Sequence, residues 1–365
     1  MNMRGFFLTI AAAAAAAAAA GCATHPETPA NETEKRYFDA WMQVNHPDWT
    51  KSEHWIYIDE DNEITGDGEE ISDGYLFVEY AVRDLSGNIT SSTREEDAMK
   101  LNTYKEQNYY GPEVWMTSSM TAGVYYAMFD LGGMRTGGRR QAIIPGWMSS
   151  SARYDTEEEY LKNVTGNSNA IYDIEFVGQT EDISAWQSDR MAEFVEDNQL
   201  GLFTQLSPSD TAETGFYYEG EIYADGALAG YDTERLDTDT ASTLFATDTT
   251  VDINYIGRRL DGQAFDTTIE RVAKDNNIYT SGKEYAPVKI TWGENYSSIK
   301  MGDDGNSVIT GFAKTLWRMS CREGVTRAAG MFWSDFGYNY SGSGDMIPGY
   351  APLIFEIEFT ENPEE

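Results

Sequence analysis

Apolar positions along the chain predict the same short supersecondary unit twice. Residues 76–93 read LFVEYAVRDLSGNITSST, and residues 251–268, offset by 175 positions, read VDINYIGRRLDGQAFDTT. In both segments polar and apolar residues alternate around a Tyr, and a period of two is typical of a half-buried strand. A turn ending in Gly and a pair of Ser or Thr residues follow. We therefore expect a strand, a turn and a second strand in each half of the chain.

Two further segments repeat in the same order. The segment MTAGVYYAMFDLG at 120–132 corresponds to VITGFAKTLWRMS at 308–320, and YDIEF at 172–176 corresponds to FEIEF at 355–359. The first pair predicts a short helix with Gly near its start, and the second pair predicts a closing strand. These segments are offset by 188 and 183 positions, whereas the first pair is offset by 175. Such differences are expected if the two copies have loops of different length. The pattern predicts two tandem α+β domains, because a solenoid has more and shorter repeats.

A helix is expected ahead of each copy. Apolar residues recur at helical spacing in KRYFDAWMQV at 35–44, where Tyr37, Phe38, Trp41 and Val44 carry the pattern. The segment ISAWQSDRMAEFVEDNQ at 183–199 shows the same spacing. The first domain is accordingly placed at 33–181 and the second at 182–365.

The first 22 residues predict a targeting segment. Arg4 precedes an apolar run from Phe6 to Ala20, and Ala19-Ala20-Gly21-Cys22 follows. This ending resembles a bacterial lipobox, in which Cys22 is lipidated and anchors the protein to a membrane. Ala19 stands where Leu is usual, so an ordinary secretory peptide is the alternative. Residues 23–32, ATHPETPANE, are polar and Pro-containing, as expected of a tether.

Composition excludes several classes of function. The net charge is −35, with 61 acidic against 26 basic residues, and a surface this acidic repels nucleic acid. Cys321 is the only cysteine besides Cys22, so an internal disulfide or a Cys-based zinc site is not expected. His25, His46 and His54 all precede the repeated segments, which argues against nucleophilic catalysis through imidazole in the main domains. No cofactor or metal is expected.

Five segments of the second half occur in a characteristic order. They are Asn254-Tyr255-Ile256-Gly257, Leu260-Asp261-Gly262, Phe265-Asp266-Thr267-Thr268, Val308-Ile309-Thr310-Gly311-Phe312 and the C-terminal stretch DFGYNYSGSGDMIPGYAPLIFEIEF at 335–359. In this order they resemble the FKBP-type peptidyl-prolyl cis-trans isomerases. The resemblance implies two tandem FKBP-like domains, each with an antiparallel twisted sheet wrapped on a short helix.

The resemblance also implies the site residues. The walls and floor of a proline pocket would come from four aromatic residues, Tyr255, Phe265, Phe312 and Phe355. The sides would come from Val308, Ile309 and Ile347, with the Ile309 N–H and the Tyr338 hydroxyl holding peptide carbonyls. Asp266 would lie at the pocket edge, with Arg271 as its ion-pair partner and a further substrate-binding residue.

The chain departs from the family pattern at several positions. Phe312 stands where Trp is usual, and the stretch between Thr268 and Val308 is much longer than in compact members, so it either overhangs the pocket or only lengthens a strand. In the first half the strand Tyr is Tyr80, Ile89 and Thr90 replace Phe-Asp, and Val124 replaces the floor aromatic. This predicts that only the second copy retains a binding pocket and that the first is degenerate.

The function that the resemblance implies needs no nucleophile. Rotation about an X–Pro bond meets a barrier of about 18–20 kcal/mol, and an apolar pocket that binds the twisted amide lowers it. We therefore expect a lipid-anchored isomerase of the bacterial cell envelope, on the outer membrane and facing the periplasm or the cell surface, which acts on proline-containing segments of exported proteins. The alternative is a non-catalytic protein that binds chains or a partner. The oligomeric state is open.

Overall fold

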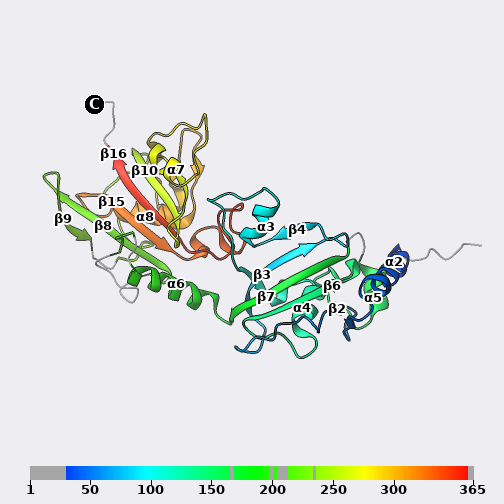
Figure 1. Cartoon of the computed structure of the whole chain (residues 1–365). Helices are drawn as coiled ribbons and strands as arrows, with labels where there is room; N and C mark the ends of the chain where they lie inside the picture. Colours follow the sequence, from blue (N-terminus) through cyan, green and yellow to red (C-terminus); the bar gives the residue numbers. More distant parts are fainter. Residues whose placement is uncertain (1–29, 165–167, 198–199, 204–212, 233–235, 361–365) are drawn as a thin grey trace, which may run out of the picture.

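The computed structural model describes residues 30–360 except 165–167, 198–199, 204–212 and 233–235. The predicted signal peptide, Cys22 and most of the predicted tether lie outside the described residues. The described chain forms two α+β domains that follow one another along the sequence (Figure 1). The first domain ends with strand β7 at Thr180 and helix α6 begins at Ile183, where the repeats predict the join.

The N-terminal domain is built on a seven-stranded antiparallel sheet. The strand order is β1-β2-β6-β7-β3-β4, and β5 also pairs with β3. The strands are β1 (Thr50–Lys51), β2 (Tyr57–Ile58), β3 (Tyr75–Arg83), β4 (Ile89–Ser92), β5 (Glu113–Met116), β6 (Gly138–Ile144) and β7 (Ala170–Thr180). The helices are α2 (Ala30–Asn45), α3 (Glu95–Lys100), α4 (Ala122–Phe129) and α5 (Glu157–Asn163), with short 3-10 helices at Thr117–Ser119 and Gly146–Met148.

The C-terminal domain has a nine-stranded antiparallel sheet of order β14-β13-β12-β10-β16-β15-β8-β9, with β11 also paired to β10. The strands are β8 (Phe216–Ala224), β9 (Ala227–Asp232), β10 (Thr250–Arg259), β11 (Ala264–Thr267), β12 (Val288–Thr291), β13 (Lys300–Met301), β14 (Asn306–Ser307), β15 (Val325–Phe332) and β16 (Leu353–Thr360). The helices are α6 (Ile183–Asp197), α7 (Glu270–Asp275) and α8 (Thr310–Met319), with 3-10 helices at Tyr296–Ser298, Ser334–Phe336 and Asn339–Ser341.

Hydrogen bonds around the two strand tyrosines confirm the predicted duplication. The N–H of Tyr80 donates to Oγ1 of Thr93 at 3.0 Å, and the N–H of Tyr255 donates to Oγ1 of Thr268 at 3.0 Å. Tyr80 pairs with Ile174 on β7 as Tyr255 pairs with Ile357 on β16. The Ser/Thr pair thus has a structural role in both copies, because it fixes the second short strand against the first.

The repeat extends into the loop that follows Thr93 in the first domain and Thr268 in the second. Tyr104 and Tyr110 stack with ring centroids 5.5 Å apart, and Tyr279 and Tyr285, 175 positions later, stack at 5.4 Å. In each loop the second Tyr hydroxyl accepts a backbone N–H, from Lys105 at 3.0 Å and from Thr280 at 2.9 Å. The part of the stretch after Thr268 that runs to β12 is therefore common to both domains, and β13 and β14 are present in the second sheet alone among the described residues.

Helices α4 and α8 bury apolar side chains against their sheets. Helix α8 lies so close to β15 that a Cβ on Gly311 would come within 2.4 Å of the Phe332 ring. Gly123 of α4 is equally confined, since a Cβ there would come within 2.3 Å of Ile144. The Gly that opens each helix is thus required by close packing between helix and sheet.

The helices expected ahead of each domain are present as α2 and α6, but the buried face of α2 differs from the prediction. Phe38 and Met42 are buried, whereas Tyr37 is 58% and Val44 79% exposed. Helix α2 begins at Ala30, inside the segment predicted as tether. Among the described residues, no helix combines the length and the apolar character that crossing a bilayer requires.

Candidate active site

Strand pairing in the C-terminal domain brings the predicted aromatic residues to one place. Gly257 on β10 pairs with Asp266 of β11 on one side and with Phe355 of β16 on the other. A Cβ on Gly257 would come within 2.7 Å of the Phe265 ring and 2.9 Å of the Phe355 ring. The absence of a side chain at this position therefore leaves the room in which the two rings lie.

The aromatic side chains form one cluster over helix α8. The Phe312 ring, from α8, lies 5.4 Å from the Tyr255 ring and 5.1 Å from the Phe355 ring, both edge-on. The Phe265 ring is 5.6 Å from that of Phe355 and 6.5 Å from that of Tyr338. Edge-to-face arrangements at these distances are favourable for aromatic pairs. The structure thus brings together all six residues predicted as catalytic, since Asp266 adjoins Phe265 on β11.

Asp266 is the charged group at the edge of this cluster. Its Oδ2 accepts the Tyr255 hydroxyl at 2.6 Å, and its Oδ1 lies 2.9 Å from Nζ of Lys283. Burial and the Asp266 carboxylate together raise the pKa of Tyr255 well above its usual range. The same two causes raise the pKa of Tyr338. Both hydroxyls therefore stay protonated near neutral pH and can donate hydrogen bonds.

The cation that holds Asp266 is not the predicted one. Arg271 lies on α7 with its side chain 88% exposed, and its nearest recorded carboxylate is Asp275 at 3.9 Å. Lys283, from the loop between α7 and β12, takes the place expected for Arg271. The prediction from residue spacing was wrong because Arg271 on α7 points to solvent. The loop after α7 instead brings Lys283 to Asp266. A substrate-binding role for Arg271 stays a prediction.

The three aliphatic residues predicted at the sides occupy the expected elements. Val308 and Ile309 are half-buried, immediately before α8, and pack on the same apolar cluster as the buried Ile347. Ile309 is the residue before the first helical position, and N–H groups at the start of a helix have no partner within the helix. This placement is compatible with the predicted hydrogen bond from the Ile309 N–H to a peptide carbonyl.

A cavity of about 270 Å³ lies beside Phe265 and Asp266. Its remaining lining includes Tyr279, Lys283 and Tyr285 of the loop after α7, and Gln107 of the N-terminal domain. The long stretch after Thr268 therefore flanks this cavity through its loop, and it does not lengthen a strand but adds β12, β13 and β14 to the sheet. The participation of Gln107 could not be expected from the sequence.

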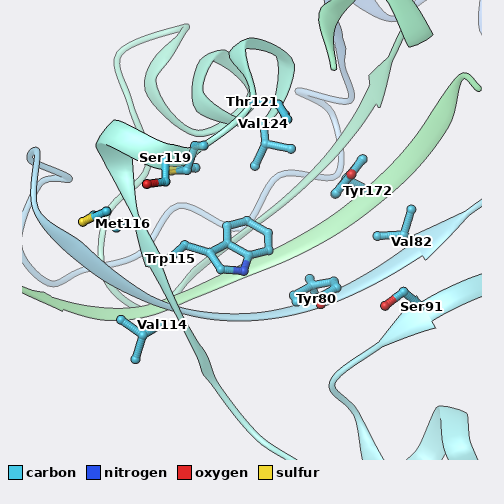
Figure 2. Close-up of a pocket in the computed structure, with 11 residues that line it drawn as sticks. Tyr80, Val82, Ser91, Val114, Trp115, Met116, Ser119, Thr121, Val124 and Tyr172 are labelled. Atoms are coloured by element: carbon cyan, nitrogen blue, oxygen red, sulfur yellow. The ribbon is translucent and has the colours of Figure 1, made fainter. Parts of the chain in front are cut away.

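The N-terminal domain also contains a cavity, and the prediction that only the second copy retains a binding pocket stays a prediction. Its volume is about 480 Å³. The lining residues come from β3, β4, β5, β7, helix α4 and the segment before α4: Tyr80, Val82, Ser91, Val114, Trp115, Met116, Ser119, Met120, Thr121, Val124 and Tyr172. Figure 2 shows Val124 projecting from its helix toward the strands that carry Trp115, Tyr80 and Tyr172.

Strand register identifies what differs between the two pockets. Val82 pairs with Ser91 and Tyr172, as Gly257 pairs with Asp266 and Phe355. Thr90 and Ser91, and not Ile89 and Thr90 as predicted, therefore replace Phe265 and Asp266. The Tyr80 hydroxyl donates to Glu113 Oε2 at 3.0 Å, and burial together with this carboxylate raises the pKa of Tyr80 to about 12.

One group of side chains in the described part of the chain could hold a metal ion. Ligand atoms of Glu53, His54 and Asp130 lie within 4.8 Å of one another. Nδ1 of His54 is 2.7 Å from Asp130 Oδ1, and the His54 ring stacks on that of Tyr126 at 3.7 Å. These contacts already account for the position of His54, and none of the three residues lines either cavity described above.

No protein-family model matches the chain, and no curated protein does. Among solved structures, it overlaps FkpA from Escherichia coli at 15% identity, covering 50% of this chain and 74% of FkpA, with a TM-score of 0.28. The three FKBP domains of wheat FKBP73 overlap at 12% identity over 84% of this chain and 94% of that one (TM-score 0.22). A peptidyl-prolyl cis-trans isomerase from Pseudomonas syringae overlaps at 20% identity over 50% of this chain and 98% of that one (TM-score 0.23).

The tandem arrangement of two like domains follows from the chain itself, in which two α+β domains repeat one strand order and one set of tyrosine hydrogen bonds. In the second domain every segment of the FKBP pattern lies at the element that the pattern predicts. The fold is thus a tandem of two α+β domains with the same strand order, and the second domain carries an aromatic cluster edged by the Asp266 carboxylate.

Proposed function

We propose that the C-terminal domain is a peptidyl-prolyl cis-trans isomerase. The observation that carries the proposal is the convergence of Tyr255, Phe265, Phe312 and Phe355 on one apolar cluster, edged by the carboxylate of Asp266. No imidazole and no nucleophile is needed for this reaction, because no covalent bond to the substrate forms.

The pocket residues supply two contributions to rotation about the X–Pro bond. The twisted amide has less charge separation than the planar one, so a dry aromatic pocket binds the transition state better than the ground state. Hydrogen bonds from the Ile309 N–H and the Tyr338 hydroxyl would hold peptide carbonyls on either side of the proline and keep the chain bent. Asp266 orients the Tyr255 hydroxyl at 2.6 Å and so stiffens the pocket wall.

We further propose that the protein acts in the bacterial cell envelope, attached to a membrane through an acylated Cys22. The lipobox-like Ala19-Ala20-Gly21-Cys22 supports this, and acyl chains anchor a protein without a spanning helix. The substrates would be proline-containing segments of exported proteins met while they fold. The oligomeric state stays open.

Replacing Phe265 by Ala is expected to lower the acceleration of X–Pro isomerisation about five-fold, the size of a lost aromatic contact. Phe265 is 7% exposed and its ring contacts those of Phe355 and Tyr338. The measurement is cis-to-trans relaxation of a short X–Pro peptide with the full-length protein. Thr90→Ala, at the same register position of the N-terminal domain, is the matched control and should leave the rate unchanged. Equal rates for wild type and Phe265→Ala would contradict the assignment of the site.

A second function, binding without catalysis, is favoured in the N-terminal domain by its open cavity of about 480 Å³. The cavity has aromatic walls but Ser91 in place of the carboxylate of Asp266. We propose that it binds apolar segments of the same polypeptides. A chain held at two sites is retained longer than by either alone.

Filling this cavity provides the test. Val124→Trp is expected to remove one of two binding events for an apolar, proline-containing peptide in calorimetry while the isomerisation rate stays unchanged. Val124→Ala, which leaves the cavity open, should keep both events. A single binding event already in the wild-type protein would contradict the second function, and a lost isomerisation rate in Val124→Trp would contradict the separation of the two sites.

A further inference from the structure

The loop between α3 and β5 of the N-terminal domain reaches the pocket of the C-terminal domain. The loop is anchored to its own domain by the Gly111 N–H, which donates to the Thr93 carbonyl at 3.0 Å. Its Tyr109 hydroxyl donates to the Pro112 carbonyl at 3.0 Å, so the loop is also internally braced. Figure 1 shows α3 and this loop beside the C-terminal domain. There the Tyr109 N–H donates to the carbonyl of Asp345 at 2.8 Å.

Arg259, at the end of β10, joins the two domains. Its Nη1 donates to the carbonyl of Met346 at 2.6 Å and to that of Gln107 at 3.2 Å. Nε and Nη2 bind the carboxylate of Asp261, which fixes the guanidinium plane. Its side chain is 9% exposed. Hydrogen bonds from a buried charged group are among the strongest that a protein makes.

The loop that receives these bonds carries a pocket residue. Asp345 and Met346 immediately precede Ile347, which is 4% exposed and packs on the aromatic cluster. Further along, Tyr350 has φ of +60°, a conformation that is costly for a bulky residue, and its ring lies edge-on to Tyr75 of the N-terminal domain at 5.5 Å. Contacts from the other domain thus stabilise a loop that is strained on its own.

The N-terminal loop also borders the space next to the pocket. Gln107 lines the cavity of about 270 Å³ together with Phe265, Asp266 and Lys283. In the C-terminal domain the corresponding loop supplies Lys283 to Asp266. The two copies of one loop therefore flank the same cavity, one from each domain.

From these contacts we infer that the N-terminal domain completes the substrate cleft of the C-terminal site: Arg259 positions the Asp345–Ile347 loop against the N-terminal loop, and Gln107 forms part of the wall that meets residues flanking the proline. Arg259 is a positioning residue, because it acts through the loop. Gln107 is a specificity residue, because it lines the same cavity as the charged groups of Asp266 and Lys283. The inference deepens the proposed isomerase function and rests on it for its kinetic readouts.

The test compares Arg259→Ala with Arg258→Ala in the full-length protein. Arg258 is the preceding residue on β10, and its recorded partners, Glu356 and the carbonyl of Gly262, are both in the C-terminal domain. Arg259→Ala is expected to raise KM for a ten-residue X–Pro peptide about five-fold or more with little change in kcat, because one buried charged hydrogen-bond network is lost. Hydrogen exchange of residues 343–347 should accelerate in the same variant. Arg258→Ala should change neither quantity.

Gln107→Arg tests the wall directly. An added positive charge in this cavity should lower KM for peptides with Asp or Glu next to the X–Pro pair and raise it for peptides with Lys or Arg there. Unchanged hydrogen exchange and unchanged KM in Arg259→Ala, from an active wild type, would overturn the inference. If the wild type has no isomerase activity, the proposed function fails. In that case the inference is tested by comparing hydrogen exchange of residues 343–347 and the calorimetric affinity for the same peptide between the wild type and Arg259→Ala.

Discussion

Replacing Gly257 by Val is expected to abolish most isomerisation, with a fall in kcat/KM on the order of a hundred-fold, because a pocket displaced by about 1 Å loses its productive geometry. The first carbon of the new side chain would already meet the rings of Phe265 at 2.7 Å and Phe355 at 2.9 Å. Neither ring can be avoided, since Phe355 pairs with Gly257 on one side and Phe265 precedes its other partner, Asp266. We expect the free energy of unfolding to fall by about 1–3 kcal/mol through overpacking.

The N-terminal domain supplies the natural comparison for this variant. Val82 occupies the position of Gly257, and there it faces Thr90 and Ser91, not Phe265 and Asp266. The matched control is Val82→Ala, which should leave isomerisation unchanged. The relaxation assay and a thermal melt separate the two effects of Gly257→Val. Wild-type activity in a folded Gly257→Val protein would show that the reaction does not use this pocket.

Replacing Asp266 by Val is expected to lower kcat/KM by about ten-fold or more, since one charge-assisted hydrogen bond is worth roughly 1.5–3 kcal/mol and about 1.4 kcal/mol is ten-fold in rate. The substitution removes the acceptor of the Tyr255 hydroxyl at 2.6 Å and the partner of Lys283. The Tyr255 ring is then no longer held against Phe312, so the wall of the pocket loosens.

Two controls isolate the role of the carboxylate. Asp266→Asn retains an acceptor for Tyr255 but loses the charge that pairs with Lys283, so its rate should lie between those of the wild type and Asp266→Val. Ser91→Val, at the same register position of the N-terminal domain, should have the wild-type rate. Equal rates for Asp266→Val and the wild type would mean that the carboxylate has no part in the reaction.

The fold was predictable where local pattern and pairing agree. The alternation around Tyr80 and Tyr255, and the Gly that opens α4 and α8, carry enough information because strand period and close helix packing are local requirements. The buried face of α2 was not predictable to the residue. Val44 has the spacing of an inward position but is 79% exposed, because α2 turns Phe38 and Met42, and not Tyr37 and Val44, toward the core.

The site was predictable as a set of residue types but not in its electrostatics or its boundaries. Phe265 and Asp266 are adjacent in the sequence, so they lie close together whatever conformation the surrounding loops adopt. Lys283 reaches Asp266 only because the loop after α7 turns back, and Arg271 sits at the expected spacing with its side chain in solvent.

The N-terminal cavity was not predictable from the sequence, because its volume is the space left between several helices and strands. Trp115 of β5, Val124 of α4 and Tyr172 of β7 line it, and no local pattern in one of these elements reports the size of the space between them. The same holds for the contact between Gln107 and the C-terminal pocket, because domain docking is a property of two surfaces.

The most direct test of the central claim is cis-to-trans relaxation of a short peptide with an apolar residue before proline, measured at increasing concentrations of the full-length protein. The account predicts a relaxation rate that rises in proportion to protein concentration and that falls in Gly257→Val and Asp266→Val. A rate equal to that of the peptide alone, from protein whose melting curve shows it to be folded, would contradict the claim that the C-terminal pocket is an isomerase.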